Sequence, residues 1–88
     1  MQVYKQGTIK DLVLLDKTKL LFIDTETSKL GSQIRLIQLF QEHLTQVLIF
    51  DVSVGPVNIL TIWELIKDLH WVGHNLTYDM GCFNKDLP

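Results

Sequence analysis

The chain has 88 residues, of which 47% are hydrophobic and 20% charged. This composition is typical of a small globular domain and excludes a disordered tail. The longest apolar runs have four residues, far fewer than the roughly 20 that a membrane-spanning helix needs. Eight Lys and Arg residues against ten Asp and Glu residues give a net charge of −2, so charge alone does not equip the chain to bind nucleic acid.

Cysteine usage and the N-terminal residues indicate a cytoplasmic protein. Cys82 is the single cysteine, so no disulfide can form within the chain. The first residues lack the basic segment followed by an apolar segment that marks a secretory signal. We therefore expect a reducing compartment, the cytoplasm, and no membrane partner.

Local patterns predict a helix and a central strand in the first third of the chain. Gln2–Tyr4 is compatible with a short edge strand. Thr8 is suited to cap a helix, and Asp11 stands where an acidic side chain reaches back to the cap. The apolar run in Lys19–Asp24 predicts a strand that is covered on both faces, with Phe22 in the core.

The rest of the chain continues the alternation of strands and helices. Ile34–Phe40 and Gln46–Asp51 are joined by a short polar segment and predict an antiparallel hairpin. Apolar residues then recur at helical spacing from about Asn58 to Leu69, which predicts an amphipathic helix. His70–His74 predicts a short strand, and Asn75 is suited to cap a final helix. This order predicts an α/β domain with a mixed sheet.

A first candidate site is Asp24-Thr25-Glu26 at the carboxyl end of the predicted central strand. Residues two apart in a strand point the same way, with Cα atoms roughly 6.6 Å apart, so Asp24 and Glu26 are expected on one face. Such a carboxylate pair provides the oxygen ligands that Mg²⁺ and Mn²⁺ prefer. Taken alone, the pattern is common and favours an Asp that simply ends the strand and a solvated Glu in a turn.

A second candidate site is the segment His74–Asp79. If Asn75 caps the final helix, Asn75 and Asp79 lie four residues apart on neighbouring positions. An acidic residue in the first turn is favoured by the helix dipole. Taken alone, this segment is an ordinary helix start, and His74 an ordinary exposed histidine.

The two segments together, in this order, resemble a known family. The strand that ends in Asp24-Thr25-Glu26-Thr27, the hairpin entered through Ile34–Leu39, and Val72–Asp79 resemble the DEDD (DnaQ-like) 3′–5′ exonucleases. The similarity is to ribonuclease D and to the proofreading domain of family A DNA polymerases, and it extends from about Leu20 to Phe83. The resemblance implies a ribonuclease H-like mixed sheet with flanking helices. It also implies hydrolysis of phosphodiester bonds at the 3′ end of single-stranded RNA or DNA.

The resemblance also implies a role for each matching residue. Asp24 and Glu26 would bind the two divalent ions, Mg²⁺ or Mn²⁺, and Asp79 would support the second ion. Asn75 would lie beside the substrate backbone. Thr27 and Leu30 would contact the 3′-terminal nucleotide.

The family has a third motif, a Tyr or His followed by an Asp on a later helix, which this sequence does not show. The chain ends nine residues after Asp79. We therefore expect residues 1–88 to form a partial exonuclease domain, incomplete at its C-terminus, with a second chain as one source of the missing acid. An alternative is a non-catalytic ribonuclease H-like module that binds nucleic acid or a partner protein.

Overall fold

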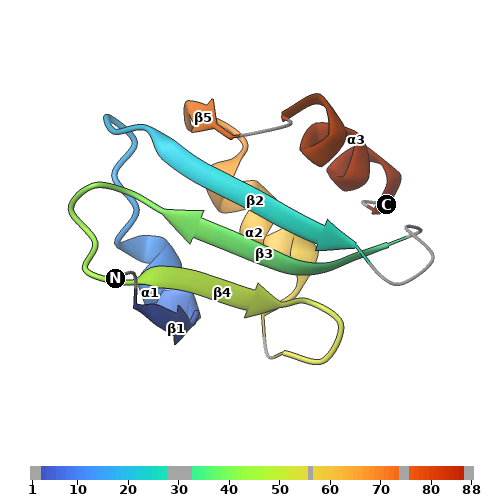
Figure 1. Ribbon diagram of the computed structural model, residues 1–88, viewed down its shortest axis with the longest axis horizontal. Coiled ribbons are helices and arrows are strands. Elements are labelled where there is room, and N and C mark those ends of the chain that lie inside the picture. Colours follow the sequence, from blue (N-terminus) through green and yellow to red (C-terminus); the bar gives the residue numbers. More distant parts are fainter. Residues whose placement is uncertain (1–2, 28–32, 56, 74–75, 87–88) are drawn as a thin grey trace.

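The computed structural model describes residues 3–27, 33–55, 57–73 and 76–86. Five strands and three helices follow one another along this part of the chain (Figure 1). In chain order they are β1 (Tyr4–Gln6), α1 (Ile9–Val13), β2 (Leu21–Thr27), β3 (Ile34–Phe40), β4 (Val47–Asp51), α2 (Ile59–Ile66), β5 (Trp71–Val72) and α3 (Leu76–Asp86). No described helix is both long and apolar enough to cross a bilayer.

The strands form one mixed sheet in the order β1-β4-β3-β2-β5. Strand β3 runs antiparallel to both β2 and β4, as the predicted hairpin requires. The two outer strands are parallel to their neighbours, β1 to β4 and β5 to β2. The mixed α/β sheet predicted from the sequence is therefore confirmed, with β3 at its centre and β2 beside it.

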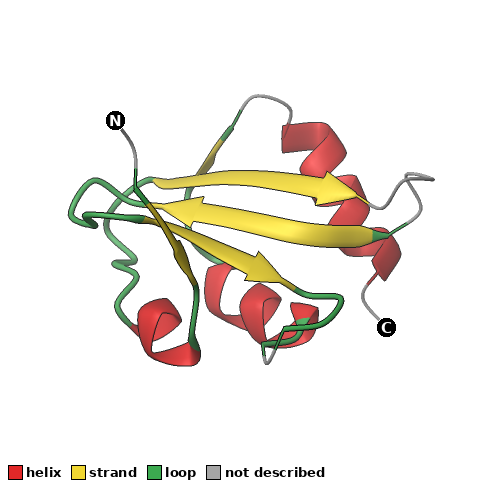
Figure 2. Cartoon of the chain, turned by 60° about the horizontal axis from the view of Figure 1, so that its bottom comes forward, coloured by secondary structure: helices red, strands yellow, loops and turns green. Residues whose placement is uncertain are grey.

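Helices α1 and α2 pack on the same face of the sheet (Figure 2). Leu12 of α1 and Ile62 and Ile66 of α2 are buried against inward side chains of the strands. Those inward side chains belong to one apolar cluster, which includes Leu21, Ile23, Ile37, Leu39, Leu48 and Phe50. We call this side of the sheet the covered face.

The opposite side of the sheet, which we call the open face, has no described helix over it. Along β2 the exposure alternates, with Leu21, Ile23 and Thr25 buried and Phe22, Asp24 and Glu26 exposed. The prediction that this strand is covered on both faces, with Phe22 in the core, is therefore wrong. Phe22 is 44% exposed. Adjacent side chains in a strand point to opposite faces, and those of Leu21 and Ile23 point inward, so that of Phe22 points outward.

Helix α1 begins with the capping box predicted from the sequence. The Thr8 hydroxyl accepts a hydrogen bond from the Asp11 amide, and the Asp11 carboxylate accepts one from the Thr8 amide at 2.9 Å. Asp11 is almost fully buried and also accepts a hydrogen bond from Lys5 Nζ at 2.9 Å. This ion pair ties β1 to α1, although the helix ends at Val13, earlier than its apolar residues predict.

Helix α2 also begins where the sequence predicts, because Asn58 accepts a hydrogen bond from the Thr61 amide at 2.9 Å. It ends at Ile66, before Leu69. Leu69 is nevertheless buried, because the chain turns there toward β5 and keeps this side chain on the covered face.

The capping network of α1 predicts a pH-dependent contribution to stability. The pKa of Asp11 lies below the ordinary value of an aspartate, first because of the hydrogen bond from Lys5 and then because of the bonds from Thr8. A lowered pKa contributes stability that is fully present above the unfolded-state pKa and is lost as the pH falls through the folded-state pKa. We expect Asp11→Asn to lower the urea midpoint at neutral pH and to have a much smaller effect at an acidic pH where the Asp11 carboxyl is protonated in the folded protein as well. An equal effect at both pH values would contradict this account.

Candidate metal site

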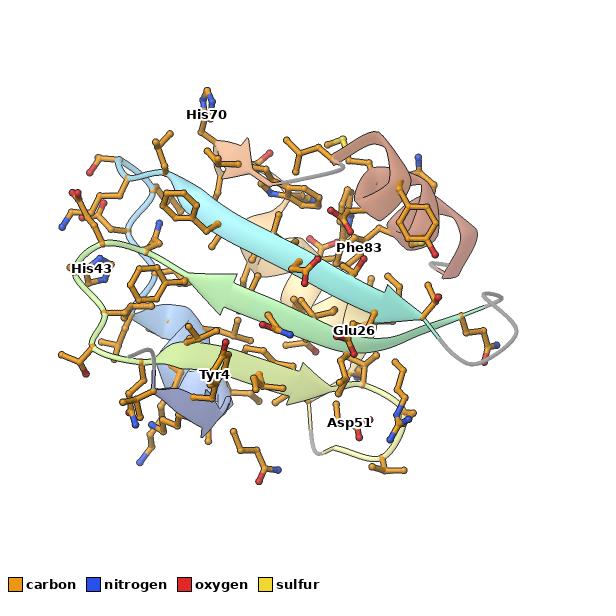
Figure 3. All side chains as sticks on the ribbon, viewed as in Figure 1. Tyr4, Glu26, His43, Asp51, His70 and Phe83 are labelled. Atoms are coloured by element: carbon orange, nitrogen blue, oxygen red, sulfur yellow. The ribbon has the colours of Figure 1, made fainter. Side chains whose placement is uncertain are left out.

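Asp24 and Glu26 lie together on the open face of the sheet. Both belong to β2 and both are exposed, as the two-residue spacing predicts. Glu26 lies in front of the sheet in Figure 3, on the side opposite α1 and α2. Within the described part of the chain, neither carboxylate has a hydrogen bond or an ion pair. Two neighbouring negative charges without a cationic partner form a place where a cation is favoured.

Asp79 lies elsewhere, on the covered side of the sheet. It stands in the first turn of α3, is only 3% exposed, and accepts a hydrogen bond from the Thr25 hydroxyl. Thr25 lies between Asp24 and Glu26 in the sequence, so its side chain points to the other face of β2. The alternation of the strand thus separates Asp79 from the carboxylate pair.

A second hydroxyl contact holds α3 to the same strand. The Thr27 and Tyr78 hydroxyl oxygens are 3.2 Å apart. Consecutive residues of α3, Tyr78 and Asp79, therefore bind to alternate residues of β2. Thr27 thus contacts this helix, and its contact with a nucleotide stays a prediction.

Aromatic packing fixes the other end of α3. Phe83 is fully buried, and its ring centroid is 5.4 Å from that of Trp63 and 5.5 Å from that of Trp71. The Trp71 indole donates a hydrogen bond to the Ile66 carbonyl at 2.8 Å. These contacts join α2, β5 and α3 into one packed unit.

The chain passes very close to β2 at Gly73, directly after β5. A Cβ atom at this position would lie 2.8 Å from the Ile23 carbonyl oxygen and 2.9 Å from Leu76 Cδ2. Glycine is therefore required for this close approach, which brings α3 within reach of Thr25.

The expectation that Asp24, Glu26 and Asp79 converge on one centre is not met. Among the described residues, no group of three or more His, Cys, Asp and Glu side chains could hold a metal ion. The physical reason is the Thr25 hydroxyl, which binds Asp79 on the covered face. Leu30 and Asn75, the other two candidates, lie outside the described residues.

Asp51 is a further carboxylate on the open face. It lies near Glu26, since Leu36 of β3 pairs with Glu26 on one side and with Asp51 on the other. Its side chain is already bound, since the Ser53 hydroxyl donates to it at 2.6 Å and the Ser53 amide at 3.1 Å. The hydroxyl bond is the main reason that its pKa lies below the ordinary value. Asp51 thus stabilises the turn after β4.

The donor set fits one divalent ion better than two. Asp24 and Glu26 offer the oxygen ligands that Mg²⁺ and Mn²⁺ bind, and water can complete the shell at an exposed site. A centre with two ions needs further carboxylates, and Asp79 does not face this side of the sheet.

Comparison with known proteins agrees with the fold. The sequence matches the family model of the 3′–5′ exonuclease domain over residues 3–87. The chain therefore belongs to the 3′–5′ exonuclease family, and its sheet with flanking helices is of the ribonuclease H-like type.

A solved structure shows the same fold. The crystal structure of the Aedes aegypti Nibbler EXO domain matches with a TM-score of 0.57 and 23% identity, over 78% of this chain and 35% of that chain. The present chain thus spans about a third of the length of that domain. No curated protein matches the sequence.

The sequence analysis missed the contact between Thr25 and Asp79 and the exposure of Phe22. The pattern that could have indicated both is the alternation of inward and outward side chains from Leu21 to Glu26. It places Thr25 inward and Phe22 outward once the strand is extended past Asp24.

The contact between Thr25 and Asp79 yields a test by paired substitution. Thr25→Val removes the donor and leaves a buried carboxylate unpaired, which we expect to cost about 1–3 kcal/mol of unfolding free energy. Adding Asp79→Leu replaces both partners by apolar groups and should recover part of that loss. Urea denaturation followed by circular dichroism measures each variant.

Thr27→Val is the matched control, because its bond to Tyr78 joins two neutral, more exposed groups. We expect it to cost no more than about 1 kcal/mol. Strictly additive effects of Thr25→Val and Asp79→Leu would contradict the contact.

Proposed function

We propose that the chain provides part of a metal-dependent 3′–5′ exonuclease site, in the cytoplasm, for single-stranded RNA or DNA ends. The observation that carries this proposal is the carboxylate pair Asp24 and Glu26 on the open face of β2, which has no hydrogen-bond or ion-pair partner among the described residues. Family membership supports phosphodiester hydrolysis as the reaction. The compartment rests on the cysteine usage, since Cys82 is the single cysteine of the sequence.

Electrostatics explain why a metal belongs in this proposal. The chain has a net charge of −2, and its pair of acids would repel a phosphodiester. A divalent ion bound there supplies Lewis-acid chemistry for hydrolysis of the phosphodiester bond. The role of Asp24 and Glu26 is to hold that ion beside the backbone of a strand lying on the open face.

A second candidate function is a binding module without catalysis. The specific observation in its favour is that Asp79 is bound to Thr25 on the other side of the sheet. If a further chain supplied the missing carboxylates, the site would be complete and catalysis would be possible. The first proposal, in which this chain provides only part of the site, includes such a partner.

Titration with Mn²⁺ tests whether Asp24 and Glu26, rather than another carboxylate on the open face, bind the metal ion. By calorimetry we expect Mn²⁺ to bind weakly, because two carboxylates complete only part of a coordination shell. Asp24→Asn and Glu26→Gln should each weaken binding by about tenfold or more. Asp51→Asn is the matched control, an open-face carboxylate already bound to Ser53, and should leave Mn²⁺ affinity unchanged.

Hydrolysis is tested with a single strand labelled at its 5′ end. We expect little or no shortening from the 3′ end by the chain alone, and any slow shortening should depend on Mn²⁺ and disappear in Asp24→Asn. Strand binding with neither Mn²⁺ binding nor shortening would instead support the binding module. Shortening that persists in both Asp24→Asn and Glu26→Gln would exclude the pair as the site.

A further inference from the structure

The pairing of β2 with β3 is irregular at the end of β2 that carries the acids. Glu26 is opposite Leu36, but the residue after Glu26 is opposite Ile34. Arg35 is thus left without a register partner on β2 and is the extra residue of a β-bulge. Bulges change the direction of a side chain relative to the regular alternation and are frequent beside active sites. The bulge therefore determines on which side of the strand the Arg35 side chain lies.

The burial pattern of β3 shows that the bulge keeps Arg35 out of the core. Ile37 and Leu39 are fully buried in the apolar cluster of the covered face. Regular alternation would continue this series to Arg35 and place its charge among apolar side chains, which is costly. Instead Ile34 is buried and Arg35 is exposed. The bulge thus brings the single arginine of the sequence to the surface.

Arg35 lies next to the carboxylate pair, where β2 and β4 end. Leu36, the residue after it, pairs with Glu26 on β2 and with Asp51 on β4. The Arg35 carbonyl accepts a hydrogen bond from the Val52 amide at 2.9 Å. Figure 3 shows Glu26 and Asp51 at this same end of the sheet. Because neighbouring strands are about 4.8 Å apart and successive residues about 3.3 Å apart, the Cα atoms of Arg35 and Glu26 are roughly 6 Å apart.

The guanidinium of Arg35 is free to bind a ligand. Among the described residues it has no hydrogen bond and no ion pair. Its charge contributes to the lowered pKa of Asp51, but the main cause is the Ser53 hydroxyl, which is bound to that carboxylate. The five N–H donors of a guanidinium are therefore all available here.

The other cationic side chains are paired or lie elsewhere. Among the lysines whose side chains the structure describes, three are paired with acids, namely Lys5, Lys19 and Lys67. Lys10 lies on α1, and Lys17 lies in the turn before β2, at the opposite end of that strand from the acids. The described part of the chain therefore offers one unpaired lysine or arginine beside the carboxylate pair.

We propose that Arg35 binds a backbone phosphate of the single strand, next to the phosphate that an ion at Asp24 and Glu26 would hold. This inference rests on the proposed function, since it names a further contact to the same substrate. A guanidinium binds a phosphate through two parallel hydrogen bonds, which fix the orientation of the backbone. Such a contact carries no sequence information, which suits an enzyme that removes one nucleotide after another.

The test measures how binding of a single strand depends on salt. The probe is a fluorescein-labelled oligothymidine about eight nucleotides long, a length typical of single-strand sites. Its binding to the full chain is followed by anisotropy with EDTA present, so that no metal ion contributes. Each phosphate neutralised on a single strand adds about 0.7 to the steepness with which log K falls against log salt concentration. The slope therefore reports how many phosphates the protein contacts.

We expect Arg35→Ala to weaken binding at low salt by about tenfold and to reduce the steepness of the slope by about 0.7. Arg35→Lys should keep most of the slope, because the charge remains, but only part of the affinity, because the two parallel hydrogen bonds are lost. Lys17→Ala is the matched control, since it removes the same charge from an exposed, unpaired side chain at the other end of β2. It should change neither the affinity nor the slope.

Equal effects of Arg35→Ala and Lys17→Ala would overturn the proposal, because they would reflect only the net charge of the chain. An unchanged slope in Arg35→Ala, or no measurable binding by the wild-type chain, would overturn it as well. If circular dichroism shows that Arg35→Ala does not fold, Arg35→Lys decides, and an unchanged affinity in that variant would reject the two-bond contact.

Calorimetry with Mn²⁺ tests the proposed function separately. If Mn²⁺ does not bind to Asp24 and Glu26 while the effect of Arg35 on the slope persists, the metal site is rejected and the phosphate contact stands. If Mn²⁺ binds and Arg35→Ala leaves the slope unchanged, the phosphate contact alone is rejected.

Discussion

Strand β2 directs adjacent side chains to opposite faces of the sheet, and the arrangement of the whole site depends on this constraint. Asp24 and Glu26 point to the open face, while Thr25 between them points to the covered face. A shift of one residue in the pairing with β3 would exchange the two sets. The register that pairs Asp24 with Gln38 therefore determines where the acids lie.

This division gives one short segment two different functions. On the covered face, Thr25 and Thr27 hold the first turn of α3 through Asp79 and Tyr78. On the open face, the acids remain free of protein partners among the described residues. The segment thus belongs to the core packing and to the candidate site at the same time, so substitutions at Thr25 and at Asp24 should affect different properties.

Much of the fold could be predicted from local sequence patterns. The capping box of Thr8 and Asp11 and the cap at Asn58 use contacts between residues three apart, which a sequence reading can detect. The hairpin of β3 and β4 likewise depends on nearby residues. These elements form where the patterns indicate because their partners are close in the chain.

The incorrect predictions concern contacts between distant residues or the choice of face. An apolar run such as the one ending at Ile23 fits a strand buried on one face as well as on two, so the exposure of Phe22 depended on what covers the sheet. Buried Gln41 is a similar case. It accepts a hydrogen bond from the Asp16 amide and donates to the Asp16 and Lys19 carbonyls, and no local pattern announces that role.

The separation of 54 residues between Thr25 and Asp79 has a consequence for the order of folding. Bringing such distant residues together costs more chain entropy than closing the hairpins of β2, β3 and β4. Helix α3 should therefore dock late and detach first, in a partial opening that leaves those three strands paired. Amide hydrogens of α3 would then exchange faster than those of β3, while Asp24 and Glu26 keep their places on an intact sheet.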